Sequence, residues 1–150
     1  MRRAAVLLSL VAFPLAAQDA PHLGTWKLNL PVGARMENGA ATTIMGSGTL
    51  TIERVGDSLV GALTLDPMPD MPPRPSSRLV APATGETEVT FTSTGTGTIK
   101  ANGVEQQLVS VSTWILRANG DSLSGTVERR MQGVAMPMGG PQPLTGTRTR

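Results

Sequence analysis

The fold is decided by two similar stretches, LTIERVGDSLVGALTL at residues 50–65 and WILRANGDSLSGTVER at residues 114–129. In each, apolar residues alternate with polar ones on both sides of the tetrapeptide Gly-Asp-Ser-Leu, which occupies 56–59 and 120–123. Alternation with a period of two predicts half-buried strands, and a short Gly-Asp turn between two such strands predicts a hairpin. Two copies are too few for a solenoid or propeller, so we expect one hairpin design to occur twice in a single barrel or tightly curved sheet.

Alternation outside the repeats predicts further short strands at 24–30, 78–81, 86–92, 96–101, 105–117 and 144–150. Pro31 is expected to end the first strand, and a looser segment rich in Gly, Ala and Thr follows to Gly48. Asn102-Gly103 is the strongest hairpin signal in the chain. The total is eight or nine strands, and we predict an all-β, antiparallel up-and-down barrel or a strongly curved meander.

The segment 105–117 breaks its own alternation. Val109 and Val111 are odd-numbered, whereas the next large apolar residue, Trp114, is even-numbered. A strand can bury all three only if an extra residue shifts its register. We therefore predict a β-bulge near Ser112-Thr113.

The N-terminus has the pattern of a secretory signal peptide, in which two arginines precede the apolar run Ala4–Leu15 and cleavage follows Ala17. The expected organisation is a signal peptide at 1–17, a short N-terminal tail at 18–23 and a single β-barrel-like domain at 24–150. A run of about a dozen apolar residues is too short for a bilayer of about 30 Å, so an uncleaved anchor is the weaker alternative. We expect a periplasmic or secreted protein that does not span a membrane after cleavage.

Charge and cysteine content exclude several function classes. The chain has 13 Lys and Arg against 11 Asp and Glu, and loss of Arg2 and Arg3 with the signal peptide leaves 11 of each. A neutral domain without a basic cluster lacks the electrostatic footprint of nucleic-acid binding. The absence of cysteine excludes disulfides and thiolate chemistry, and a single histidine excludes multi-histidine zinc sites. We expect no nucleic-acid partner and no cofactor.

The aromatic residues that follow the signal peptide are few: Trp26, Phe91 and Trp114. With 18 Thr, 17 Gly and 12 Pro, the chain favours strands and turns over helices, so its core is mainly aliphatic. We expect the three aromatic side chains to belong to this core. The alternative is that they line a ligand cavity inside the barrel.

The stretch LGTWKLNL at 23–30 resembles the Gly-x-Trp opening of lipocalin-like β-barrels. A similar opening occurs in avidin-like barrels and in small exported bacterial proteins of unknown function. In lipocalins this tryptophan closes the barrel floor under an arginine from near the end of the barrel. The resemblance implies this role for Trp26 and makes Arg148 the candidate arginine. It raises the expectation of a barrel more than that of a ligand, because fold does not fix function.

The repeated Gly-Asp-Ser-Leu resembles the nucleophile motif of the GDSL lipases and esterases, which would make Ser58 or Ser122 catalytic. A serine nucleophile needs a base, and the chain's one histidine, His22, falls in the predicted tail. Turn chemistry explains the motif instead, because Gly tolerates a positive φ and Asp or Ser can bond nearby amides. We expect no catalytic residues and no enzymatic activity.

Methionine gathers in the two segments that follow the repeated hairpins, at Met68, Met71, Met131, Met136 and Met138. Equivalent hairpins should direct these segments to the same rim of a closed barrel. The thioethers could form an adaptable apolar lid over a ligand or a Cu(I) site, or they could simply fill gaps at the barrel end. The sequence leaves these three interpretations, and hence any metal, open.

Two main functions remain. One is an exported, non-enzymatic barrel that binds a small apolar ligand, contacted by the three aromatic residues and the five methionines. The other is a structural or interaction domain whose barrel is filled by its own side chains; a Met-rich Cu(I)-binding periplasmic protein is a further alternative. Large aliphatic residues at most inward positions would favour the filled barrel, and a polar-lined cavity near the aromatic residues would favour ligand binding.

Overall fold

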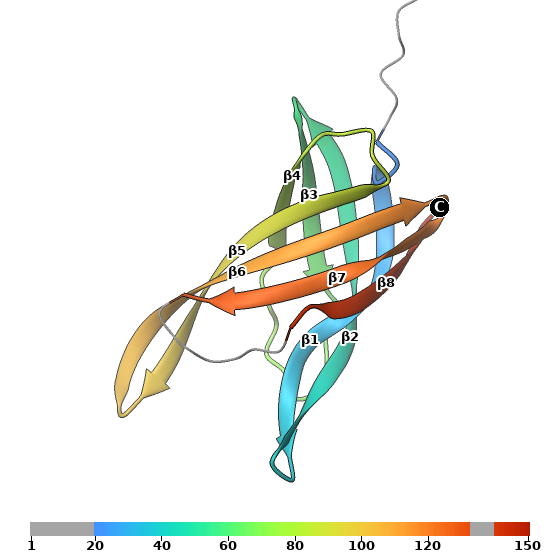
Figure 1. Cartoon of the computed structure of the whole chain (residues 1–150). Coiled ribbons are helices and arrows are strands. Elements are labelled where there is room, and N and C mark those ends of the chain that lie inside the picture. The colour runs from blue at the N-terminus through green and yellow to red at the C-terminus, as the bar shows by residue number, and fades with distance from the viewer. Residues whose placement is uncertain (1–19, 133–139) are drawn as a thin grey trace, which may run out of the picture.

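The chain folds into a closed, eight-stranded antiparallel up-and-down barrel in which every strand pairs with its sequence neighbours and β1 pairs with β8 (Figure 1). The computed structural model describes residues 20–132 and 140–150. The strands are β1 (Gly24–Glu37), β2 (Ala40–Val55), β3 (Ser58–Leu65), β4 (Ser77–Pro82), β5 (Glu88–Ala101), β6 (Val104–Asn119), β7 (Ser122–Met131) and β8 (Gln142–Arg148). The predicted all-β barrel is confirmed. No helix in the described ranges is long and apolar enough to cross a membrane.

The two repeated stretches form equivalent hairpins, β2–β3 and β6–β7. Leu50 lies opposite Leu63 in the first, and Trp114 lies opposite Val127 in the second, so the register is the same after the 64-residue offset. Their turns begin with a glycine at a φ of 60° in one and 61° in the other. A positive φ at the first turn position suits the right-handed twist of the flanking strands. One hairpin design is therefore used twice, as predicted.

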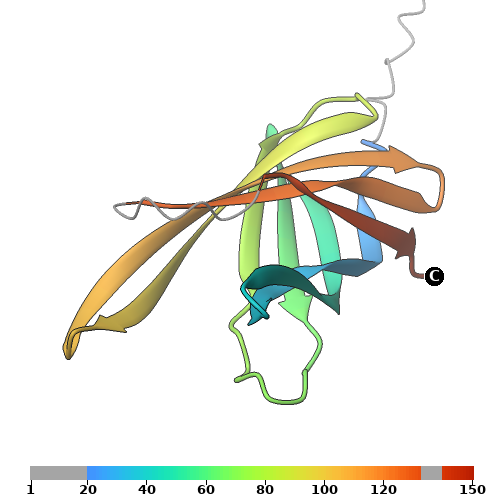
Figure 2. The same ribbon diagram turned by 60° about the horizontal axis from the view of Figure 1, so that its bottom comes forward.

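Two other hairpins are longer than the sequence suggested and project beyond the barrel wall (Figures 1 and 2). Both turn through Asn-Gly: Asn38 and Gly39 have φ values of 52° and 80°, and Asn102 and Gly103 have values of 51° and 80°. The predicted turn at 102–103 is confirmed, but the expected loose segment 31–48 is wrong. It is paired strand on both sides of the 38–39 turn, and the separate strands expected at 86–92 and 96–101 are one strand.

The predicted bulge near Ser112-Thr113 is also wrong, because β6 keeps one register with β5 and β7 along its length. From Leu108 to Ala118 its even-numbered side chains face inward, and Val109 and Val111 face the other way at intermediate exposure. The apolar alternation misled because the inward positions 110 and 112 carry serine. The register shift in β1 lies instead between Pro31 and Gly33.

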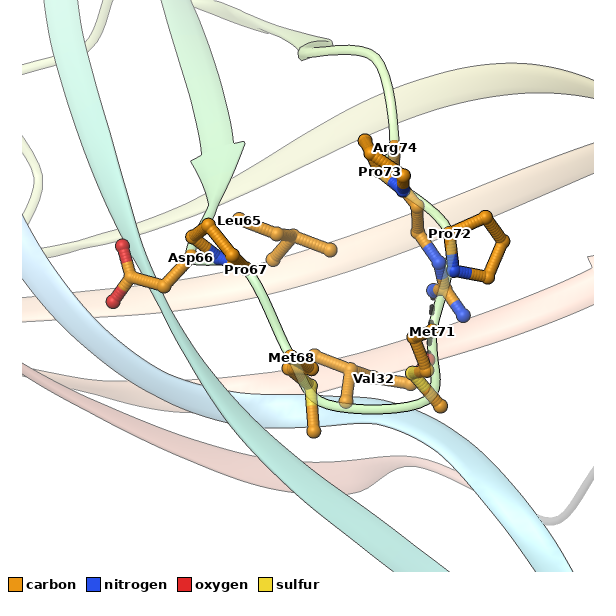
Figure 3. A pocket seen from close by; sticks show the side chains of 9 residues that line it. All are labelled: Val32, Leu65, Asp66, Pro67, Met68, Met71, Pro72, Pro73 and Arg74. Atoms are coloured by element: carbon orange, nitrogen blue, oxygen red, sulfur yellow. Dashed lines mark hydrogen bonds between the residues drawn. The ribbon is translucent and has the colours of Figure 1, made fainter.

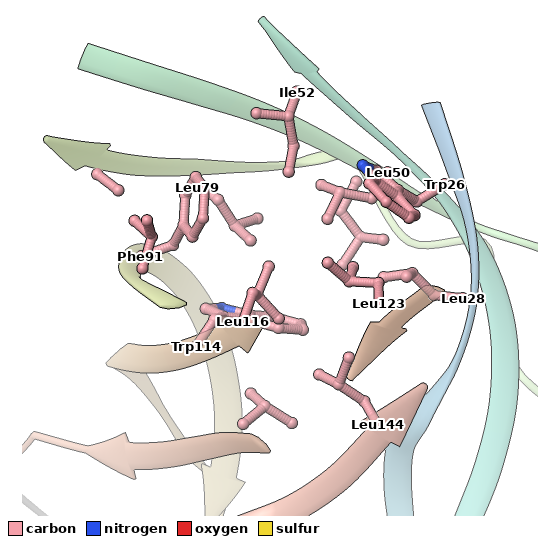
Figure 4. Close-up of a cluster of buried hydrophobic side chains, with 14 of the residues drawn as sticks. Trp26, Leu28, Leu50, Ile52, Leu79, Phe91, Trp114, Leu116, Leu123 and Leu144 are labelled. Atoms are coloured by element: carbon pink, nitrogen blue, oxygen red, sulfur yellow. The ribbon is translucent and has the colours of Figure 1, made fainter. Parts of the chain in front are cut away.

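A filled apolar core occupies the half of the barrel nearest the start of β1, which we call the floor (Figure 4). Large side chains from most strands meet there, including Trp26, Leu28, Leu50, Ile52, Leu79, Phe91, Leu116, Leu123 and Leu144. Trp26 and Phe91 are 0% exposed. Aliphatic and aromatic groups thus fill this half without help from disulfides.

The floor is closed by Trp26, His22 and Arg148. The Cζ atom of Arg148 lies 4.2 Å from the Trp26 ring centroid, so the arginine predicted from the Gly-x-Trp resemblance stands over the tryptophan. Gly24 has a φ of 117°, and a Cβ there would lie 2.7 Å from Arg148 Nη1, so this position requires glycine. Trp26 Nε1 donates a hydrogen bond to the His22 carbonyl at 2.8 Å. The segment expected to be a tail therefore packs, at residues 20–23, on the barrel end.

Candidate functional site

The opposite end of the barrel, where β3 ends and β4 begins, contains two adjoining pockets. We call this end the mouth. The outer pocket, of about 120 Å³, lies under the β3–β4 loop, and the inner pocket, of about 110 Å³, lies inside the barrel. They share Val32, Leu65 and Arg74 as lining residues. The barrel is therefore filled at its floor and hollow at its mouth.

The β3–β4 loop is held over the mouth at both of its ends. At the start, Asp66 Oδ2 accepts hydrogen bonds from Lys27 Nζ and Ser47 Oγ, each at 2.5 Å. These two donors lower the pKa of the Asp66 carboxyl. At the far end, Arg74 Nη1 donates to the Val32 carbonyl at 2.7 Å. Between these anchors the prolines limit the conformations that the loop must lose when it folds.

The outer pocket is mainly apolar. Figure 3 shows Met68, Met71 and the loop prolines around Val32, with the Asp66 carboxylate directed away from Arg74. The amide of Met71 donates to the Met68 carbonyl at 3.4 Å, which places the two methionines on one turn of the loop. Their flexible thioethers suit a surface that adapts to a small apolar group.

The inner pocket exists because small residues replace large ones at inward positions. On β5 and β6, the side chains next to Phe91 and Trp114 on the same face are Ser93, Ser112 and Ser110. Trp114 forms the base of the pocket, and its Nε1 donates to Ser93 Oγ at 3.0 Å. The facing wall is apolar, with Leu30, Leu63 and Leu65. The inner pocket therefore has one polar wall and one apolar wall.

Arg129 projects from β7 into the inner pocket. It lies on the same face as the buried residues Leu123 and Val127, and its Nε donates to Ser112 Oγ at 3.4 Å. Burial lowers the pKa of the Arg129 guanidinium, and the nearby charge of Arg74 lowers it further. The guanidinium nevertheless remains protonated. The inner pocket therefore carries two positive charges, those of Arg74 and of the half-buried Arg129.

The residues predicted as ligand contacts fall in different places. Trp26 and Phe91 lie in the filled floor, and Trp114 lines the inner pocket. Met68 and Met71 line the outer pocket. Met131 lies at the end of β7 opposite Ser110 and lines neither pocket. Met136 and Met138 lie outside the described residues.

Among the described residues, a metal site built from histidine or carboxylate ligands and a serine nucleophile gain no supporting geometry. Over residues 20–132 and 140–150 there is no group of three His, Cys, Asp or Glu side chains that could hold a metal ion. Ser58 and Ser122 each follow a Gly-Asp turn as the first residue of a strand. His22 is buried in the floor, and its Nε2 donates to the Leu116 carbonyl at 2.9 Å.

The arginines and serines of the mouth were missed by sequence reasoning. Their signal was parity: Ser110 and Ser112 share the inward face with Trp114, and Arg129 shares it with Val127. The bulge prediction concealed the first, because it placed the serines at a break rather than on the inward face. Arg74 had no comparable signal, since it belongs to a loop.

The comparisons with known proteins agree with one another: no family model, no curated protein and no solved structure matches this chain.

Proposed function

We propose that the protein is an exported, non-enzymatic barrel that binds a small ligand at its mouth. The observation that carries the proposal is the inner pocket, where inward positions of β5 and β6 hold serine and glycine instead of the large residues that fill the floor. A barrel with a purely structural role has no need of this cavity over Trp114, and an empty cavity costs stability. Ligand pockets characteristically combine apolar walls with a few placed polar groups.

We further propose that the barrel belongs with the lipocalin-like proteins. The Gly24-x-Trp26 opening supports this assignment, as does the stacking of Arg148 on Trp26 at 4.2 Å. In this proposal Trp26 and Phe91 build the scaffold, whereas Trp114, Met68 and Met71 contact the ligand.

The filled barrel that serves as a structural or interaction domain remains the second candidate. It is favoured by the size of the two pockets, about 110 and 120 Å³, because pockets for drug-sized ligands are about 300–1,000 Å³. Under ligand binding, the same volumes mean that the ligand is small or reaches out of the mouth.

Native mass spectrometry tests the proposal on the mature protein exported by its own signal peptide, from cells grown with and without added copper. We expect a bound organic mass that is lost in Ser110→Leu, which fills the inner pocket, and kept in Val111→Leu, which alters the outer face of the same strand. A bare polypeptide under both conditions would favour the filled barrel. Copper retained through Met68 and Met71 would favour the Cu(I) alternative.

A further inference from the structure

The two arginines of the mouth lack acidic partners in the part of the chain that the structure describes. The ion pairs found there use six other basic residues: Lys27, Arg35, Arg117, Arg130, Arg148 and Arg150. The segment 133–139, GVAMPMG, contains no Asp or Glu in its sequence. Within the described residues, no ion pair therefore compensates the charge of either arginine.

Arg129 differs from the basic residues of the outer surface in its position. Its neighbour on β7, Arg130, faces outward with a side chain that is 80% exposed and pairs with Glu128 at 3.0 Å. Arg129 faces inward, beside the like charge of Arg74. A half-buried cation that lies beside a like charge and has no counter-charge costs stability, and a bound anion reduces that cost. This arrangement is unfavourable for an empty barrel and favourable for one that holds an anion.

The donors at the mouth suit a carboxylate. Arg129 donates its Nε–H to Ser112 in a long hydrogen bond, and Arg74 donates from one Nη to the Val32 carbonyl. Each guanidinium group therefore has further N–H groups that can donate to a ligand. Guanidinium groups bind carboxylates through parallel, charge-assisted hydrogen bonds. The apolar wall of Leu63 and Leu65 faces this polar side across the inner pocket.

We propose that the ligand is a small organic carboxylate, whose anionic group lies between Arg129 and Arg74 and whose apolar part lies against Trp114 and the leucine wall. This inference rests on the proposed ligand-binding function and specifies its chemistry. A cavity of about 150 Å³ holds benzene, and the inner pocket is about 110 Å³ and adjoins a second one. The ligand is therefore a short aliphatic or single-ring acid.

The two tryptophan indole groups provide an internal control for the test. Trp114 Nε1 lies in the pocket, bonded to Ser93, whereas Trp26 Nε1 lies in the floor, bonded to His22. We would titrate the mature ¹⁵N-labelled protein with benzoate and hexanoate, and with their neutral counterparts benzamide and hexanamide. We expect the acids to shift the Trp114 indole resonance and leave that of Trp26 unchanged, and to bind about tenfold or more tightly than the amides.

Variants separate a binding arginine from a structural one. Arg129→Met should weaken binding of the acids about tenfold or more, and Arg74→Met should weaken it in the same direction. Arg130→Met, which makes the same change in net charge on the same strand, should leave it unchanged. In the ligand-free protein Arg129→Met should raise Tm, because it removes a half-buried, unpaired charge that lies beside Arg74. An arginine with a structural role would lower Tm on replacement.

Each result has a distinct meaning. If the amides bind as tightly as the acids, or if Arg129→Met binds the acids unchanged, the carboxylate assignment is wrong and ligand binding stands. If inorganic phosphate matches benzoate, the organic part of the assignment is wrong. If none of the four compounds shifts the Trp114 resonance, the carboxylate assignment is wrong, and a bare polypeptide in native mass spectrometry would then overturn the proposed function as well.

Discussion

Replacement of Arg148 by methionine tests whether the floor of the barrel is locked by a single side chain. Arg148 donates hydrogen bonds from Nη1 to the Leu23 carbonyl and from Nη2 to the Pro21 carbonyl, the latter at 2.9 Å. It also stacks on Trp26. Methionine keeps a long apolar stem but loses every one of these polar contacts, so packing against the indole is largely preserved.

The expected loss follows from these contacts. Two hydrogen bonds from a charged donor contribute about 1.5 kcal/mol each, and the cation–π contact contributes about 1 kcal/mol. The Arg148 side chain is 27% exposed, so water replaces part of the lost bonding. We expect the free energy of unfolding to fall by about 3 kcal/mol, which lowers Tm by about 12 °C in a domain of this size.

Urea denaturation followed by tryptophan fluorescence measures this loss, and Arg150→Met is the matched control. Arg148 and Arg150 both pair with Asp121, at 3.4 Å and 3.0 Å, but the Arg150 side chain is 88% exposed. An exposed ion pair contributes little, so the control should lose less than about 0.5 kcal/mol. Equal losses in the two variants would refute the claim that Arg148 closes the floor. A coupling of about 1 kcal/mol with Trp26→Leu in a double-mutant cycle would assign the stacking contribution, because leucine has no aromatic face.

Three further outcomes are expected. Trp114→Ala should lower the free energy of unfolding, measured by urea denaturation, by about 3–5 kcal/mol, because Trp114 is 3% exposed. Ile115→Ala, on the outer face of the same strand, should cost less than about 1 kcal/mol. Equal costs would contradict the inward position of Trp114. Gly125→Ala should lower the free energy of unfolding by more than about 3 kcal/mol, because the new Cβ meets the backbone of β6. Gly61→Ala, its counterpart in the other hairpin, should cost about 1 kcal/mol, because the new Cβ meets flexible side chains first. The reverse order of the two variants in thermal melts would contradict this. Burial lowers the pKa of His22 from its ordinary 6.5, so below that pH the unfolded chain binds a proton that the barrel does not, and stability should fall by up to about 1.4 kcal/mol per unit between pH 6.5 and the lowered pKa. Urea midpoints measured from pH 8 to pH 5.5 should show this fall in the natural protein and not in His22→Gln.

The sequence was informative wherever local pattern and tertiary role coincide. The duplicated turns and the alternation of 50–65 follow from residues whose neighbours in sequence determine their geometry. Arg148, the partner of Trp26, came instead from the Gly-x-Trp resemblance. The bulge and the loose segment were wrong for one reason: apolar alternation was treated as the only guide to the inward face. At the mouth the inward face carries serines and an arginine, and the hairpin around Asn38-Gly39 is exposed on both faces. Neither segment therefore has the alternation of buried apolar residues by which a strand is recognised in sequence.

The site could be predicted only in part. Met68 and Met71 were singled out by composition, and Trp114 by its rarity. Arg74 reaches the mouth through a loop whose path depends on Asp66 bonding to Lys27 and Ser47, contacts between residues far apart in sequence. No local pattern encodes such a path.

The duplication has a consequence for the direction in which a ligand lies. The hairpins β2–β3 and β6–β7 are four strands apart in a ring of eight, so they face each other across the barrel. Leu65 ends the first repeat and Arg129 ends the second, and both line the inner pocket. At equivalent positions, one half of the barrel therefore presents the apolar side chain of Leu65 and the other half presents the positive charge of Arg129. This departure from twofold symmetry gives the opening a polarity, so a molecule with one charged end and one apolar end has only one favourable orientation within it.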